Sequence, residues 1–106
     1  NEPCFVRINL RNNIPEKYLN SSAKKIQNKR KLRFFKKYIN DSSQFNFDEN
    51  QLVGIITPDK NIIPGAKTYK PAYLVFNNYE KILKWNRSLR FALAVCTLKD
   101  RFKNEI

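Results

Sequence analysis

The sequence has 106 residues, 42% of them hydrophobic and 13% aromatic, and a formal net charge of +12 from 21 Lys and Arg against 9 Asp and Glu. This length fits one domain, and the hydrophobic content is enough for a core, which argues against a disordered chain. No run reaches the roughly 20 apolar residues of a membrane helix, and no His is present to act as a zinc ligand or general base. The charge favours a polyanionic partner, although the many Lys, Asn and Ile residues that an AT-rich genome encodes would explain part of it.

Three segments have the composition and periodicity of β-strands. Every second residue from Val6 to Leu10 is apolar, which predicts a strand over residues 4–10 with one buried face. Runs rich in β-branched and aromatic residues predict further strands over residues 51–57 and 72–76. Because the connections are short enough for a meander, we expect the strands to pair as an antiparallel sheet.

A helix is expected between the first two strands. Two serines can cap a helix over residues 23–39, whose apolar side chains crowd its second half and whose first half is rich in Lys. Residues 40–50 have the composition of a polar loop. Within this loop we expect Phe45 and Phe47 to reach the core.

The C-terminal third changes to a helical pattern. Asn77 is placed to cap a short helix, with Glu80 at its third position as in a capping box. Ser88 can cap a last helix over residues 89–103, whose first half is apolar nearly all round. Such a helix is usually buried, and a chain of this length offers too little protein around it. Together with the start at Asn1 instead of Met, this predicts that the chain is a segment of a longer protein.

These elements predict an α+β fold with a small antiparallel sheet, one helix after the first strand and two C-terminal helices. Residues 1–76 would form a β-rich subdomain with one helix. Residues 77–106 would form a C-terminal helical segment that packs on a lobe missing from the sequence.

The two cysteines, Cys4 and Cys96, are far apart in the sequence and fit no metal-ligand spacing. Two interpretations stay open. We favour two buried free thiols, and a single disulfide in an oxidising compartment is the alternative.

No catalytic constellation can be assembled from the residues themselves. With only two Gly there is no phosphate-binding loop, and none of the carboxylates lies in an apolar stretch that would raise its pKa for general-acid chemistry. We therefore expect no catalytic residue, no metal ligand and no cofactor in this chain.

One segment carries a resemblance. Residues 78–95 contain Trp-Asn-Arg-Ser followed by Phe-Ala-Leu-Ala-Val. This closely resembles the C-terminal signature of the B-family lytic murein transglycosylases, in which an aromatic residue and Asn, followed by x-Ser, open the last helix. Upstream, Thr57-Pro58, the Pro-Gly-Ala of residues 64–66 and residues 71–75 are similar to the strand-turn-strand that precedes this helix in the family. The resemblance is strong from Gly54 to Phe102, looser before that, and weak over residues 16–50.

The resemblance implies an enzyme that cleaves the MurNAc–GlcNAc bond of peptidoglycan to a 1,6-anhydro product. Its catalytic Glu would lie upstream, in a lysozyme-like lobe, so this chain alone should be inactive. Trp85, Asn86, Phe91 and Ser88 match positions of the glycan cleft, although Trp85 and Phe91 stand where many members have Tyr. Without the resemblance, a core position would be the better interpretation for Trp85 and Phe91.

The implied partner is the glycan strand of peptidoglycan, and the implied location is the periplasm or cell envelope of a Gram-negative bacterium, with membrane association through an N-terminal anchor outside this sequence. The alternative is a non-catalytic basic module that binds cell wall or nucleic acid. Residues 24–37 are rich in Lys and Arg interleaved with aromatics, which could contact phosphates and stack on bases. They accompany no nucleic-acid fold signature, so we expect no specific nucleic-acid binding.

Overall fold

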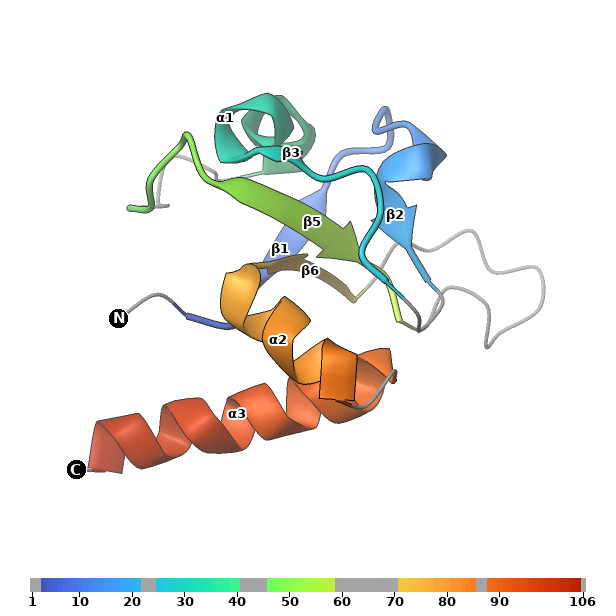
Figure 1. The fold of residues 1–106 in the computed structure, drawn as a ribbon. Helices are drawn as coiled ribbons and strands as arrows, with labels where there is room; N and C mark the ends of the chain where they lie inside the picture. Colours follow the sequence, from blue (N-terminus) through green and yellow to red (C-terminus); the bar gives the residue numbers. More distant parts are fainter. Residues whose placement is uncertain (1–2, 22–24, 41–45, 59–70, 86–87, 106) are drawn as a thin grey trace.

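The computed structural model describes residues 3–21, 25–40, 46–58, 71–85 and 88–105 (Figure 1). The strands are β1 (Phe5–Leu10), β2 (Leu19–Asn20), β3 (Arg30–Lys31), β4 (Ile39–Asn40), β5 (Leu52–Ile56) and β6 (Ala72–Val75). The helices are α1 (Leu32–Phe35), α2 (Asn77–Trp85) and α3 (Leu89–Glu105), with the single 3-10 turns η1 (Glu16–Tyr18) and η2 (Lys36–Tyr38). None of the described helices is both long enough and apolar enough to cross a membrane.

The strands form one mixed sheet. β2, β5, β6, β1 and β4 are neighbours in that order, and β3 also pairs with β5. Every pair is antiparallel except β2 with β5, because a long crossover that includes β3 and α1 separates these two strands in the chain. The expected α+β fold is confirmed, with one parallel pair added to the antiparallel sheet. The meander is wrong, because β1 pairs with β6 and not with β5.

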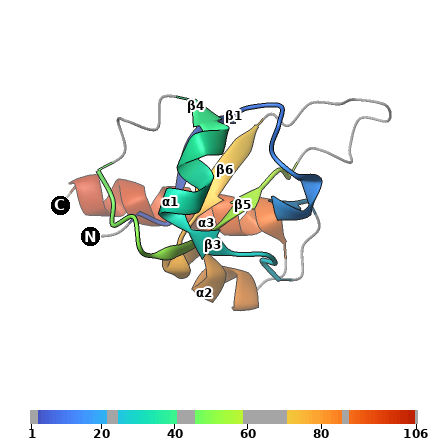
Figure 2. The same ribbon diagram turned by 90° about the horizontal axis from the view of Figure 1, so that it is seen from above.

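Helices cover both faces of the sheet. Figures 1 and 2 show α1 on one face and α2 and α3 on the other. The alternating side chains of β5 divide accordingly. Val53 and Ile55 pack with Phe35 in one core, whereas Ile56 packs with Tyr79 in the second core. Val6, Ile8 and Leu10 of β1 also point to the first core, as the alternation predicted, whereas Phe5 packs against the second.

The helix expected over residues 23–39 is wrong for most of its length. In the described part of that range, only residues 32–38 are helical, as α1 and η2. The carboxamide of Asn20 binds the backbone of the segment before them, because it accepts the N–H of Gln27 at 2.9 Å and donates to the Gln27 carbonyl at 3.2 Å. Asn28 then adopts a positive φ of 57°, which interrupts a right-handed helix, and β3 joins β5.

The segment before β3 packs closely against the sheet at one position. Ile26 is buried directly over Gly54 of β5, and a Cβ on Gly54 would overlap Cγ2 of Ile26. Because Gly54 has no side chain, the segment before β3 can lie against the sheet at this position.

The other predicted elements agree with the structure within a few residues, whereas the short strands β2, β3 and β4 were not predicted. β1, β5 and β6 lie within the three predicted strands. α2 already includes Asn77, which we expected to precede it, and the N–H of Glu80 donates to the carbonyl of Phe76 at 3.3 Å. Phe47 packs against the first core with its ring 5.3 Å from that of Phe76, as predicted, and Phe45 lies outside the described residues.

The two cysteines form a disulfide, so the free thiols that we favoured are wrong. Cys4, just before β1, is joined to Cys96 in the middle of α3 with a Cα–Cα distance of 5.8 Å. Both residues are buried in the core between the sheet and the C-terminal helices. The sequence separation of 92 residues leaves no local pattern from which this contact could be predicted.

Candidate functional site

Three of the four site residues that the sequence suggested, Trp85, Ser88 and Phe91, lie at or within a few residues of the junction of α2 and α3. α2 ends at Trp85 and α3 begins at Leu89. The buried hydroxyl of Tyr79 donates to the carbonyl oxygen of Leu89 at 2.8 Å, which ties α2 to the start of α3. Leu83 of α2 and Leu89 of α3 both pack in the same core, so the two helices are anchored to it on each side of the junction.

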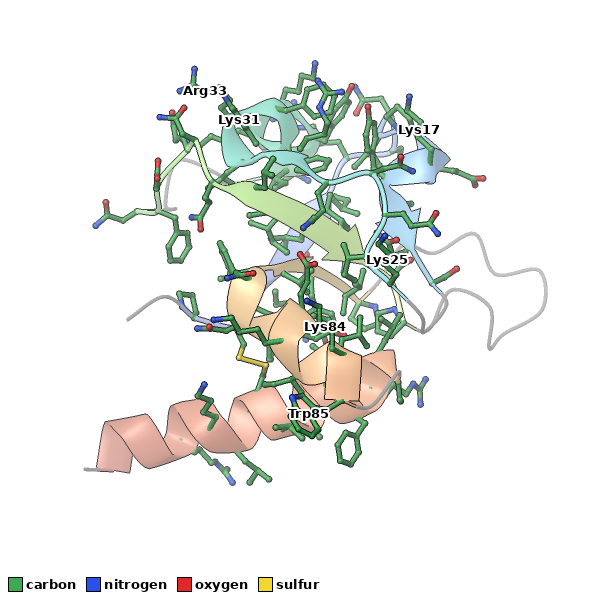
Figure 3. All side chains as sticks on the ribbon, viewed as in Figure 1. Lys17, Lys25, Lys31, Arg33, Lys84 and Trp85 are labelled. Carbon is green, nitrogen blue, oxygen red and sulfur yellow. A yellow bond between two sulfur atoms is a disulfide. The ribbon has the colours of Figure 1, made fainter. Side chains whose placement is uncertain are left out.

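Trp85 is exposed, which contradicts the core interpretation for this residue. Its side chain is 92% exposed at the end of α2, where Figure 3 shows it on the surface beside α3. Phe91 in the first turn of α3 is 50% exposed. Exposing the apolar rings of Trp85 and Phe91 to water is unfavourable. Exposed aromatic side chains near one helix junction are therefore typical of a surface that binds a ligand or partner.

Ser88 caps α3, as predicted. Its hydroxyl accepts the N–H of Phe91 at 3.3 Å and its carbonyl accepts the N–H of Ala92 at 3.0 Å. With no acceptor for it among the described residues, the hydroxyl hydrogen can bind a ligand oxygen. Asn86, the fourth residue that the sequence suggested, lies outside the described residues.

A small pocket of about 170 Å³ lies beside the cap. Among the described residues it is lined by Ser21, Pro58, Ser88, Leu89 and Arg90. The sequence had not pointed to Ser21, Pro58 or Arg90 as site residues. They come from three separate segments, and no spacing along the chain predicts that the fold would bring them together.

The apolar residues of α3 are only partly buried. Leu89, Ala92 and Cys96 form the face that is buried against the sheet and α2, whereas Leu98 is 53% exposed. The helix is therefore buried on one face, and not all round as its composition predicted.

Three of the described carboxylates, Glu80, Asp48 and Glu49, are poorly suited to act as a general acid. Glu80 pairs with Lys29 at 2.9 Å, and Asp48 is exposed and accepts the N–H of Asn50 at 2.9 Å. A side-chain hydrogen bond from Lys36 lowers the pKa of the exposed Glu49, the opposite of what proton donation near neutral pH requires. No group of three metal-ligating side chains is present in the part of the chain that the structure describes.

The chain matches the family model described as the transglycosylase SLT domain over residues 1–100. It belongs to this family. The match supports the enzyme class of lytic transglycosylases, which act on the peptidoglycan of the bacterial cell wall, and it does not distinguish the B family from other members. No curated protein and no solved structure shows a significant match to the chain.

The basic segment of residues 24–37 had suggested an alternative function, nucleic-acid binding. Its aromatic residue Phe34 contacts other side chains of the protein. The guanidinium of Arg30 lies 4.1 Å from the ring centre of Phe34, and the ammonium of Lys37 lies 4.5 Å from it. The same ring makes edge contacts with Tyr18 and Phe35. Phe34 is therefore poorly placed to stack on a nucleic-acid base.

Proposed function

We propose that this chain forms part of the glycan cleft of a B-family lytic transglycosylase, with Trp85, Asn86, Ser88 and Phe91 as substrate-binding residues. The observation that carries the proposal is the 92% exposure of Trp85 at the end of α2, in a chain of the SLT family in which Phe91, in the first turn of the next helix, is also half-exposed. Indole and phenyl faces pack well against the C–H faces of sugar rings. The Ser88 hydroxyl and the Asn86 amide would bind ring hydroxyls or an N-acetyl group.

The proposed reaction cleaves the MurNAc–GlcNAc bond without water. A general acid protonates the glycosidic oxygen, and the bond from this oxygen to C1 of MurNAc breaks. The 6-hydroxyl oxygen of the same MurNAc forms a new bond to C1 and closes a 1,6-anhydro ring. The carboxylate that donated the first proton accepts the hydroxyl proton, so one residue replaces the carboxylate pair of ordinary glycosidases.

We assign the general acid to a lysozyme-like lobe outside this chain. The ion pair of Glu80 and the lowered pKa of Glu49 argue against these two carboxylates. The half-exposed Phe91 and Leu98 of α3 are suited to pack against such a lobe. In this arrangement residues 77–106 connect the β-rich part, residues 1–76, to the catalytic lobe, and this chain alone is inactive.

The disulfide between Cys4 and Cys96 supports an oxidising compartment, because disulfides persist outside the cytosol. We propose the periplasm or cell envelope of a Gram-negative bacterium, with an N-terminal anchor outside this chain holding the protein at the membrane.

The test is made on the full-length protein with purified peptidoglycan, and the masses of the soluble products are measured. We expect 1,6-anhydro-MurNAc products that are strongly reduced by Trp85→Ala and by Asn86→Ala. Trp85→Phe, which keeps an aromatic face, should retain most of the activity. If the folded wild-type protein releases no anhydro product, the enzyme assignment is wrong and a non-catalytic wall-binding module becomes the better explanation.

A further inference from the structure

A second, larger pocket lies away from the α2–α3 junction. Its volume is about 500 Å³, which is within the range of small-ligand sites. The described residues that line it come from β3, α1 and β5 and from the residue before β3: Lys29, Arg30, Lys31, Arg33, Phe34 and Leu52. Figure 3 shows Lys31 and Arg33 beside α1, at the end of the molecule opposite Trp85.

The charge of this pocket, which we call the β3 pocket, is positive. Four of its described lining residues are cations and none is a carboxylate. Lys29 is neutralised by Glu80 at 2.9 Å. Arg30 and Lys31, in contrast, form no ion pair with any carboxylate that the structure describes. Two unneutralised cations at one concave surface favour an anionic ligand.

The walls of the β3 pocket are partly apolar. Leu52 is 57% exposed although it belongs to a strand, and Phe34 lies beneath the guanidinium of Arg30. A ligand that combines carboxylates with small apolar side chains would bind the cations and cover Leu52 as well. A phosphodiester or sugar phosphate would bind the cations but leave Leu52 uncovered. A stacked base would need a face of Phe34, over which Arg30 and Lys37 already lie.

We propose that the β3 pocket binds the carboxylates of a short acidic peptide with small apolar side chains. Given the proposed function, on which this identification rests, the peptide is the stem peptide that peptidoglycan carries along its glycan. The pocket and Trp85 would then contact different parts of the same polymer, and peptide binding would hold the enzyme on wall that still carries its peptides.

The experiment is isothermal titration calorimetry of the full-length protein with an unlabelled synthetic stem pentapeptide at low salt. The test variant is Arg30→Gln with Lys31→Gln. The matched control is Lys99→Gln with Arg101→Gln, which removes the same charge from exposed positions of α3. Circular dichroism and thermal melting establish that both variants are folded.

We expect the test variant to weaken peptide binding at least about tenfold, the effect of losing one charge-assisted hydrogen bond. The control should change it less than about twofold, and a peptide with all carboxylates amidated should bind at least about tenfold more weakly to the wild type. Equal losses in the two variants, or undiminished binding of the amidated peptide, would overturn the proposal. So would inorganic phosphate that displaces the peptide at an equal concentration, because the site would then select charge alone.

The outcome is separable from that of the proposed function. Anhydro products from a protein that does not bind the pentapeptide would refute the β3 pocket as a peptide site and leave the catalytic assignment intact. Pentapeptide binding that depends on Arg30 and Lys31, in a protein that releases no anhydro product, would support the peptide site and refute the enzyme assignment.

Discussion

The hydroxyl of Tyr79 donates a 2.8 Å hydrogen bond to the carbonyl oxygen of Leu89, and both residues are buried. This bond joins α2 to the first residue of α3. The positions of Trp85 at the end of α2 and of Ser88 just before α3 therefore depend on a contact made in the core.

Tyr79→Phe removes this bond without changing the shape of the core. We expect a loss of about 1 kcal/mol in the free energy of unfolding, because the Leu89 carbonyl loses a partner. Glycan cleavage by the full-length protein should fall as well, since the junction is held less firmly. Urea denaturation and product release from peptidoglycan measure the two effects. Wild-type stability in Tyr79→Phe would mean that the bond does not hold the junction.

Tyr79 should also make the stability of the fold depend on pH. Burial raises the pKa of the Tyr79 hydroxyl well above its ordinary value of 10.0. The folded state therefore keeps a proton that the unfolded state loses, so this contribution to stability is complete below about pH 10 and is lost as the pH rises above it. Between about pH 9 and 11, the melting temperature of the wild type should fall more steeply than that of Tyr79→Phe. Parallel curves would show that Tyr79 does not titrate differently in the two states.

Trp85 is the only tryptophan of the chain, so its fluorescence reports on the proposed cleft. Its 92% exposure predicts the red-shifted emission of an indole in water, with a shift to the blue when glycan fragments bind. Trp85→Ala should change the free energy of unfolding by less than about 0.5 kcal/mol, as at other exposed positions, while weakening glycan binding about tenfold. A strongly destabilised Trp85→Ala would instead indicate a structural role.

The disulfide should stabilise the fold substantially. It closes a loop with a sequence separation of 92 residues, and its loss should cost about 2–5 kcal/mol, chiefly because the unfolded chain gains freedom. Cys4→Ser with Cys96→Ser should melt at a markedly lower temperature than the oxidised wild type. Addition of a reductant should lower the melting temperature of the wild type and leave that of the variant unchanged. An effect of reductant on both would point to a cause other than this bond.

Gly54→Ala should destabilise the fold by about 1–3 kcal/mol, since its new methyl group would overlap Ile26. Ile26→Ala should also destabilise the fold, because it leaves a cavity between the segment before β3 and the sheet. In the double variant the methyl group added at position 54 occupies part of that space. The double variant should therefore lose less stability than the two single variants together, as chemical denaturation of all four proteins would measure. Simple additivity would mean that the two side chains do not compete for one space.

The fold could be predicted where the periodicity of a segment follows directly from which of its faces is buried. The alternation in β1 corresponds to a strand with one buried face, and it was read correctly. The segment before α1 was predicted as a helix because its composition is compatible with one. What decides its conformation is the pairing of β3 with β5 and the bonds from Asn20 to Gln27, and neither can be read from a periodic pattern.

The site could be predicted only in part for a similar reason. Ser88 caps α3 through a contact three residues away, which a local motif encodes. Trp85 and Phe91 were found through the family resemblance, since an aromatic residue beside a helix end is usually part of a core. Arg90 lies at a pocket with Ser21 and Pro58 because the tertiary fold brings these three segments together.

The bond between Cys4 and Cys96 also makes almost the whole chain a covalent ring. A protease that cuts the backbone once between these two residues would open the ring without releasing a fragment. The nicked protein would keep its mass, apart from one added water, until a reductant separated the two pieces. A single cut in the backbone would therefore leave all residues of the protein covalently joined for as long as the disulfide is oxidised.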